Sequence, residues 1–216
     1  SKLLIVAART EGEKNDASGI TLFLVESDHQ DVEITKTSMV DSRNAANIKF
    51  NDVAVSSENI IGEENNGASV LEVVLDRAQI AISAEMLGNA SQAFDLTLEY
   101  LKERKQFGAV IGTFQALQHR AAEMYSELEL TKSSVIAACN AVDQNSNDLR
   151  RMASLAKFKS GETNYLITNE AVQMHGGVGV TDEYDVGLFM KRARVTEQIF
   201  GNSEYHIDRY ATLSDY

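Results

Sequence analysis

The sequence contains no proline and no tryptophan, and cysteine occurs once, at Cys139. Proline is the residue that most readily interrupts a helix, so its absence suits long unbroken helices. A single cysteine excludes an internal disulfide bond and fits a reducing compartment. The four histidines, at positions 29, 119, 175 and 206, lie far apart and lack the spacing of metal ligands, so we expect no metal site.

Positive charge is also scarce, because 20 lysines and arginines face 32 aspartates and glutamates and leave a formal net charge of −12. This balance argues against a nucleic-acid-binding protein, which needs a basic surface to displace counterions. It leaves open an anionic small molecule, since a few local arginines bind phosphates even in an acidic protein. No apolar run approaches the roughly 18 residues of a membrane span, and the start SKLLIVAART lacks the architecture of a signal peptide.

The hydrophobic pattern changes near residue 62. Before it, strand-like runs alternate with polar turns, at Leu3–Ala8, Ile20–Val25, Val32–Thr35, Asn47–Phe50 and Val53–Val55. After it, apolar residues recur at helical spacing and predict helices over about 66–103, 114–143, 147–174, 184–199 and 204–213. Long helices joined by short loops are typical of an up-and-down bundle. The predicted fold class is α+β, mostly α, with a partial small β-domain over 1–62 and a four-helix-bundle domain over 63–216.

The β-part is expected to be incomplete. Its five short strands make a poor independent sheet, and the first begins within a few residues of the start of the sequence. An unprotected strand edge there would invite pairing with another chain. We therefore expect that further strands precede it or that another polypeptide covers it.

One candidate binding segment joins the first two predicted helices. Arg104-Lys-Gln-Phe-Gly108 is followed by Gly112-Thr-Phe-Gln-Ala-Leu-Gln-His-Arg120. An arginine that leaves a helix, a glycine turn and glutamines at the next helix start would suit a phosphate and a polar ring edge. The alternative, which composition alone favours, is a simple connection between helices with Arg104 in solvent.

Two further segments carry glycine turns. Val172-Gln-Met-His-Gly-Gly-Val-Gly179 lets the backbone approach a ligand, but it is not the GxGxxG fingerprint and also fits a helix C-cap. The segment from Phe189 to Ser203 puts Lys191, Arg192 and Arg194 on one helix before a Gly-Asn-Ser break. These cations indicate an anion site or, equally well, surface ion pairs with Glu197, Asp182 or Glu183.

These segments, in this order and spacing, resemble the acyl-CoA dehydrogenase family. Its helical domain carries an R-x-x-F-G turn, an F-Q helix start, a G-G-x-G loop and a final glycine turn. The β-part is similar to the family's middle domain in AART…GITLFLV, in Asp41-Ser-Arg43 and in Phe50-Asn-Asp-Val-Ala-Val before Ile61-Gly62. The resemblance covers about residues 3 to 213.

The resemblance implies that FAD lies between subunits of a homotetramer, a dimer of dimers, or of a heteromer with a related subunit. Arg104 and Phe107 would then meet the pyrophosphate and adenosine half of FAD, with Ile111 nearby and Gln115 hydrogen-bonded to it. Gln173 and Gly177 would contact the pyrophosphate region. Ser203 replaces the family's threonine in the final glycine turn, and Tyr205 stands where many members have glutamine.

The implied chemistry is α,β-dehydrogenation of an acyl-CoA thioester, with an electron-transfer flavoprotein or an equivalent acceptor reoxidising the flavin. A carboxylate removes the α-proton, flavin takes the β-hydrogen as hydride, and backbone N–H groups stabilise the enolate oxygen. The family's Y-E-G-T turn matches Phe200-Gly-Asn-Ser203, which puts Gly201 at the usual glutamate. The alternative base position on the first long helix matches Ala78, beside Gln79, so neither position carries a carboxylate.

Three nearby acids are candidates for a relocated base: Asp76, which precedes an arginine as in the family, Glu85 and Glu204. Each also fits an ordinary surface carboxylate or helix cap, and of the three we expect Asp76 to be the base. Loss of general-base catalysis costs about 10²–10⁴-fold in rate. An alternative function is therefore a non-catalytic, FAD-binding partner subunit of a heteromeric dehydrogenase, and a third is a purely structural helical bundle.

Two features of the resemblance concern context. GGVGVTDEYDVG and FGNSEYHIDR look like a bacterial branch that includes small subunits of heteromeric dehydrogenases, so we expect a cytoplasmic bacterial protein. The family's N-terminal helical domain and first β-strands have no counterpart in the sequence. We therefore expect this polypeptide alone to bind FAD weakly or incompletely.

Overall fold

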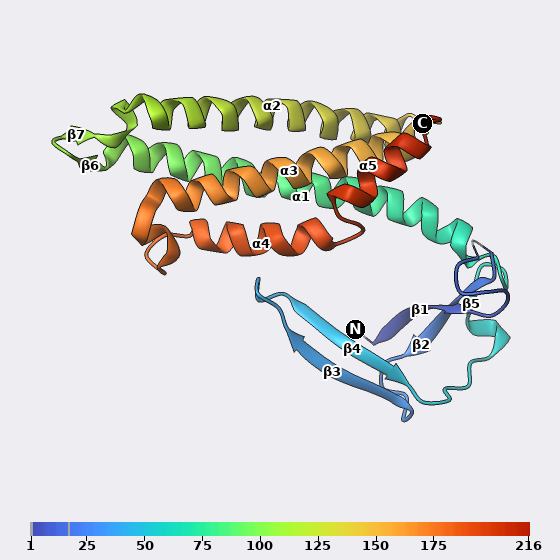
Figure 1. Ribbon diagram of the computed structural model, residues 1–216. Helices are drawn as coiled ribbons and strands as arrows, with labels where there is room; N and C mark the ends of the chain where they lie inside the picture. Colours follow the sequence, from blue (N-terminus) through green and yellow to red (C-terminus); the bar gives the residue numbers. More distant parts are fainter. Residues whose placement is uncertain (1, 17) are drawn as a thin grey trace. The chain divides into compact units, whose positions relative to one another are not determined.

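The computed structural model describes residues 2–16 and 18–216. They form two compact units, which divide between Leu75 and Asp76, inside the first long helix. The smaller unit is built of strands and the larger unit of helices (Figure 1).

The β-unit contains two antiparallel sheets. β1 (Leu3–Arg9), β2 (Ile20–Glu26) and β5 (Ile60–Ile61) pair in the order β1-β2-β5, and β3 (Val32–Ser38) pairs with β4 (Asn44–Phe50) as a hairpin. A short 3-10 helix, η1 (Ser57–Asn59), leads into β5. Strand β2 is central in its sheet, so Thr21, Leu22 and Val25 are its buried residues.

The predicted strand at Val53–Val55 is wrong. The segment has alternating apolar residues but lies outside every strand, and it follows a turn in which Asp52 has a left-handed φ of 55°. The neighbouring edge of β2 is occupied instead by Ile60 and Ile61, which pair with Phe23 and Leu22. A strand needs a partner edge as well as the right pattern, and Val53–Val55 pairs with no strand among the described residues.

The helical predictions are confirmed to within two residues at each end. The helices are α1 (Gly67–Glu103), α2 (Gln115–Asp143), α3 (Leu149–His175), α4 (Val186–Gln198) and α5 (Ser203–Thr212). In Figure 1, α1, α2 and α3 run side by side as long helices, with α4 and α5 packed against α3. The mostly helical, bundle-containing fold class is thus as predicted.

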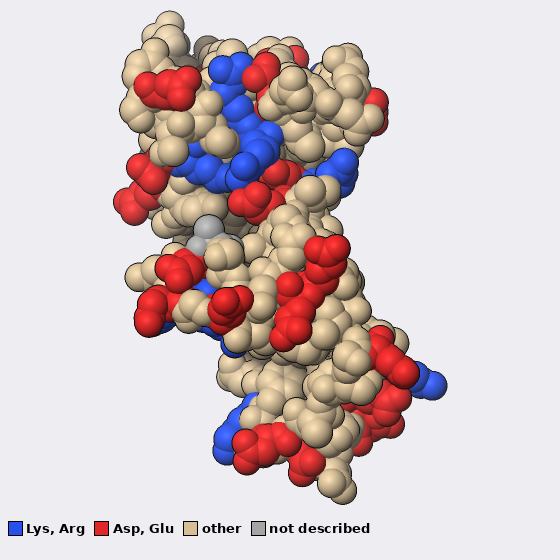
Figure 2. All heavy atoms as spheres, turned by 90° about the vertical axis from the view of Figure 1, so that its right-hand side faces the viewer, with Lys and Arg blue, Asp and Glu red and all other residues tan. Residues whose placement is uncertain are grey.

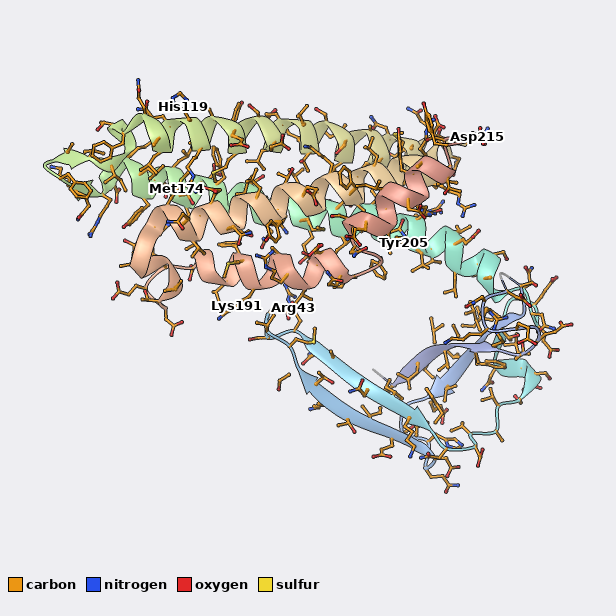
Figure 3. The ribbon with its side chains drawn as sticks, viewed as in Figure 1. Arg43, His119, Met174, Lys191, Tyr205 and Asp215 are labelled. Carbon is orange, nitrogen blue, oxygen red and sulfur yellow. The ribbon has the colours of Figure 1, made fainter. Side chains whose placement is uncertain are left out.

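Helix α3 is buried over most of its circumference, because it packs against α2, α4 and α5. Small residues permit this close packing: Ala153, Ala156, Ser160, Gly161 and Ala171 are all buried. Their size lets neighbouring backbones approach, so the core of the helical unit forms around α3. Figure 3 shows Met174 of α3 among the helices, whereas His119 of α2 lies on the outer surface.

Polar side chains also join the helices inside this core. Thr131 of α2 donates to Thr163 of α3 at 2.7 Å. Asn89 of α1 donates to Asn164 of α3 at 2.8 Å and to the carbonyl of Phe189 on α4 at 3.1 Å. Buried hydrogen bonds of this kind fix the register of neighbouring helices, because an unpaired partner would be costly.

Two connections contain regular structure of their own. The α1–α2 connection forms a small hairpin of β6 (Lys105–Gln106) and β7 (Ala109–Val110), followed by the 3-10 helix η2 (Ile111–Thr113). The glycine-rich segment after α3 forms the 3-10 helix η3 (Gly176–Val180).

Acidic and basic side chains are interspersed on the face drawn in Figure 2, where clustered lysines and arginines are bordered by aspartates and glutamates. Among the described residues, no helix is both long and apolar enough to cross a membrane. That part of the chain also contains no group of His, Cys, Asp and Glu placed to hold a metal ion.

We expect Ile167→Ala to lower the free energy of unfolding by about 2–5 kcal/mol, because it leaves a cavity in the core. Ile167 of α3 has no exposed surface. The matched control is Leu130→Ala on α2, where the side chain is 57% exposed and the change is expected to stay within about 0.5 kcal/mol. Urea denaturation measures both, and equal losses would contradict the position of α3 at the centre of the core.

Candidate functional site

The tip of the β6–β7 hairpin holds a phenylalanine out in solvent. Phe107 and Gly108 form the two-residue loop and have positive φ angles of 55° and 79°. Two such residues in succession are typical of a type I′ turn, in which asparagine and glycine are usual. Phe107 is 94% exposed, and its ring lies edge-on to the ring of Phe114, at 6.3 Å between centroids. A strained, exposed aromatic residue at a loop tip points to a binding role.

Three predicted cofactor residues lie near this hairpin or on the adjoining end of α3. Arg104, Gln115 and Gln173 are exposed. Within residues 2–16 and 18–216, no hydrogen bond or ion pair engages their side-chain polar groups. Beside Gln173 the backbone is open as well, because a Cβ at Gly177 would meet no atom within 4 Å. These groups therefore have unused capacity to bind a polar ligand.

An aromatic cluster joins the ends of α1 and α3. The ring of Tyr100 stacks on His175 at 4.2 Å, and its hydroxyl donates to the His175 carbonyl at 3.2 Å. The edge of Tyr184 meets both rings, at 5.3 Å and 5.1 Å. Burial lowers the pKa of His175, so its ring is neutral at pH 7. Because it joins the end of α1 to the end of α3, this cluster places the β6–β7 hairpin and the exposed Gln173 at the same end of the helical unit.

We call the residues of this end the end cluster, and define it as Arg104, Phe107, Gln115, Gln173 and Gly177. Ile111, predicted to lie near the cofactor, is 8% exposed and belongs to the helical core. The Ile111 side chain anchors the α1–α2 connection to that core.

The remaining predicted residues lie in the turn between α4 and α5, residues 199–202, which we call the α4–α5 turn. Phe200 and Gly201 have positive φ angles of 60° and 103°. Glycine suits this position in the folded chain, since its φ is positive and a Cβ would lie 2.4 Å from the ring of Tyr205. The Asn202 side chain caps α5 by accepting from the Tyr205 N–H at 3.0 Å, and Tyr205 is labelled at this helix start in Figure 3.

Ser203 lies against α3. Its hydroxyl is buried without a hydrogen-bond partner among the described residues, and it lies 2.9 Å from the position of a Cβ on Gly161. Gly161 and Gln173 are twelve residues apart in α3, which corresponds to about 18 Å along the helix. The structure therefore separates the predicted cofactor residues into two groups, the end cluster and the α4–α5 turn.

Two buried side chains that the sequence did not reveal hold the α4–α5 turn. Lys157 of α3 donates to the carbonyls of Glu197, at 2.9 Å, and Gly201, at 2.8 Å. His206 of α5 places Nε2 3.0 Å from the Phe200 carbonyl. Burial lowers the pKa of Lys157 to about 8, and it lowers the pKa of His206 to about 4.

A signal for Lys157 was present in the helical spacing. Lys157 lies on the same stripe of α3 as the small residues Ser160, Gly161 and Asn164, which repeat three or four positions apart. A lysine within a stripe of small buried residues is a candidate for a buried charge, since the small neighbours leave room for its long stem.

The three candidate acids differ in their partners. Asp76 is 3% exposed, and its carboxylate lies 2.5 Å from Nη2 of Arg209 and 3.8 Å from Nε of Arg150. Glu85 accepts from Nε of Arg192 at 2.6 Å. Glu204 lies exposed in the first turn of α5, and no hydrogen bond or ion pair of its side chain occurs among the described residues.

Two of the three predicted cations of α4, Arg192 and Arg194, contact neighbouring helices. Arg192 donates to Glu85, as above. Arg194 lies 3.9 Å over the ring of Tyr165 and donates to Asn169 at 2.9 Å. Both arginines therefore tie α4 to neighbouring helices, α1 and α3, by contacts that the sequence did not predict.

Comparison with known proteins gives a family match over most of the helical unit. The family model described as "Acyl-CoA dehydrogenase, C-terminal domain" matches residues 65–212. The probable acyl-CoA dehydrogenase YngJ of Bacillus subtilis is 34% identical over 207 residues, which are 94% of this chain and 54% of that protein. The caffeyl-CoA reductase-Etf complex subunit CarC of Acetobacterium woodii is 34% identical over 203 residues, 93% of this chain and 53% of that protein.

Among solved structures, butyryl-CoA dehydrogenase from Megasphaera elsdenii is similar with a TM-score of 0.92 and 28% identity, over 100% of this chain and 57% of that one. The chain thus spans about half the length of the proteins that it matches.

We expect Phe107→Asn to keep the free energy of unfolding or raise it by up to about 1 kcal/mol, because asparagine accepts a left-handed φ more readily than phenylalanine. The control is Phe94→Ala in the core, where the side chain is 6% exposed and the loss is expected to be about 3–5 kcal/mol. Thermal and urea denaturation measure both. A loss at Phe107 as large as that at Phe94 would show that the ring stabilises the fold.

Proposed function

Because this chain belongs to the acyl-CoA dehydrogenase family, we propose that it takes part in the flavin-dependent α,β-dehydrogenation of an acyl-CoA thioester. Members of the family are FAD-dependent oxidoreductases. The observation that carries the proposal is the end cluster, whose exposed polar side chains have no partners among the described residues and which includes the outward-pointing Phe107.

The end cluster fits the phosphate and adenosine half of FAD. Arg104 would grip a phosphate, Phe107 would stack on a ring, and Gln115 and Gln173 would hydrogen-bond to polar edges. At Gly177 the backbone is open to close approach. When bound, FAD would accept the hydride from the substrate's β-carbon.

The separation of about 18 Å along α3 between the end cluster and the α4–α5 turn supports a site shared between subunits. We propose that the end cluster of one chain serves a neighbour's cofactor, whereas the α4–α5 turn serves its own. Such sharing requires an oligomer, as a homotetramer or as a heteromer with a related subunit. The electron acceptor would be an electron-transfer flavoprotein, in line with the name of the related CarC subunit, and the setting a bacterial cytoplasm.

The role of the α4–α5 turn would be to stabilise negative charge on the thioester oxygen. The N–H group at Gly201 is placed by the turn, and backbone N–H groups at such a position stabilise an enolate oxygen. The turn can bind and orient the substrate without any side chain at Gly201.

The α4–α5 turn supplies no side chain that could act as the catalytic base. Residues 199 to 203 include no carboxylate. If the family's glutamate position matched a residue one before or one after Gly201, that residue would not be an acid either. Asp76 would act as base only after leaving Arg209 and Arg150, which hold its carboxylate in the folded chain. Glu204 is free of such pairing among the described residues but lies beyond the turn. The paired state of Asp76 favours the second candidate function, an FAD-binding partner subunit without its own base.

We expect FAD-reconstituted protein to lose flavin absorbance when mixed anaerobically with the right member of an acyl-CoA panel. If Asp76 is the base, Asp76→Asn slows this bleaching by about 10²–10⁴-fold, whereas Glu204→Gln leaves it near wild type. The reverse pattern would move the base to Glu204. Circular dichroism checks that both variants keep their helices, since Asp76 also contributes to a buried ion pair.

The partner-subunit function predicts a different result. Flavin would then bind, no acyl-CoA would bleach it in the chain alone, and co-expression with a glutamate-bearing homologue would give a stable, active complex. A protein that neither binds FAD in any assembly nor forms such a complex would contradict both functions.

A further inference from the structure

Lys157 is the largest side chain in the helical unit that is almost completely buried, with 1% of its surface exposed. Its ammonium donates to the carbonyls of Glu197 and Gly201, which flank residues 198–200. Glu197 is in the last turn of α4, where carbonyl groups lack helical partners and a cation is favourable. One charged group therefore ties the end of α4 to the middle of the following turn.

His206 holds the same turn from α5. A carbonyl only accepts hydrogen bonds, so Nε2 must carry the proton that is shared with the Phe200 carbonyl at 3.0 Å. With its pKa lowered to about 4 by burial, the ring is neutral at pH 7, and Nδ1 is the deprotonated nitrogen. Two successive carbonyls, of Phe200 and Gly201, are thus each bound by a buried side chain.

Binding of these carbonyls sets the direction of the next N–H groups. In a trans peptide the C=O and the following N–H point in opposite directions, and the described residues contain no cis peptide bond. The N–H of Gly201 therefore points away from His206, and the N–H of Asn202 points away from Lys157. No hydrogen bond within the described residues uses either N–H.

We propose that Lys157 and His206 are positioning residues that orient the Gly201 and Asn202 N–H groups of the α4–α5 turn toward the oxygen of the bound thioester. This inference rests on the proposed function, because it assigns to the turn the carbonyl oxygen of an acyl-CoA. The two side chains touch neither substrate nor cofactor, and they act through the peptide groups that they hold.

The surroundings of Lys157 explain why it stays charged near neutral pH. Burial disfavours the ammonium, and the carboxylate of Glu197 on α4 opposes that effect. The charges of Lys157, of Arg209 on α5 and of Asp76 on α1 all act on the pKa of His206, so these side chains and His206 form one electrostatic group. A lysine that served only to cap α4 would do so from the surface, without the cost of burial.

The orientation can be measured without cofactor or substrate. The sequence contains two Gly-Asn pairs, Gly201-Asn202 and Gly88-Asn89. Protein labelled with carbonyl-¹³C glycine and ¹⁵N asparagine therefore gives two peptide signals in carbon-detected NMR spectra. The Gly201 signal is expected to shift with pH with a midpoint near the Lys157 pKa of about 8, while the Gly88 signal, from the middle of α1, stays in place.

Lys157→Met removes the ammonium and keeps most of the volume, and we expect it to abolish this titration. We also expect hydrogen exchange of the Tyr205 and His206 amides, which donate to Asn202, to be faster by about tenfold or more, as for loss of a hydrogen bond to a charged group. Lys159→Met, two residues along α3 on a lysine paired with Glu127, is the matched control and should match wild type.

Anaerobic flavin-bleaching assays measure the effect of the same substitution on kcat and KM. In an active assembly, Lys157→Met should lower kcat by about 10²-fold with little change in KM, because misplaced donors act mainly in the transition state. A wild-type Gly201 signal that ignores pH, or an active Lys157→Met variant with full kcat, would overturn the inference. If the signal titrates but no acyl-CoA is turned over in any assembly, the positioning of the turn stands and the proposed substrate class falls.

Discussion

A buried ammonium group fixes how the last three helices of the chain meet. Lys157 lies on α3, and the carbonyls that it binds belong to the end of α4 and to the turn before α5. Small residues on the same stripe of α3, such as Gly161, let these elements approach closely enough for its stem to be buried. If the Lys157 side chain lost its amino group, the carbonyls of Glu197 and Gly201 would lose their partner, so the geometry of the turn depends on Lys157 as well as on His206.

Under the proposed function, the same arrangement lets the α4–α5 turn bind the thioester oxygen without a catalytic side chain. Residues 199–202 provide backbone N–H groups, and Gly201, which the family resemblance places at the usual carboxylate, lies under a tyrosine ring. Among the described residues, the buried acid is Asp76, which is held by Arg209 and Arg150. On the proposed function, the described residues would therefore serve FAD and thioester binding more completely than proton transfer. This imbalance is what makes a partner subunit a serious second function.

The sequence predicted the parts of the structure that depend on local pattern. Helical spacing of apolar residues located all five α-helices to within two residues at each end. The predicted strand at Val53–Val55 was wrong because alternation says nothing about which edge of β2 is free. The pair of Asp76 and Arg209 joins residues 133 positions apart, so no local pattern contains it. Lys157 was missed because a lysine in a helix is ordinarily a surface residue.

The most direct test of a charged, buried Lys157 is the pH dependence of the free energy of unfolding. Its pKa is about 8 in the folded chain, against 10.5 for a lysine in solvent, so the unfolded chain binds the proton more tightly. Stability contributed by this group therefore rises as pH increases from about 8 to about 10.5, by about 3 kcal/mol in total. Urea denaturation of wild type and Lys157→Met across this range isolates the effect. The account predicts that the wild-type curve climbs relative to the variant; parallel curves would contradict it.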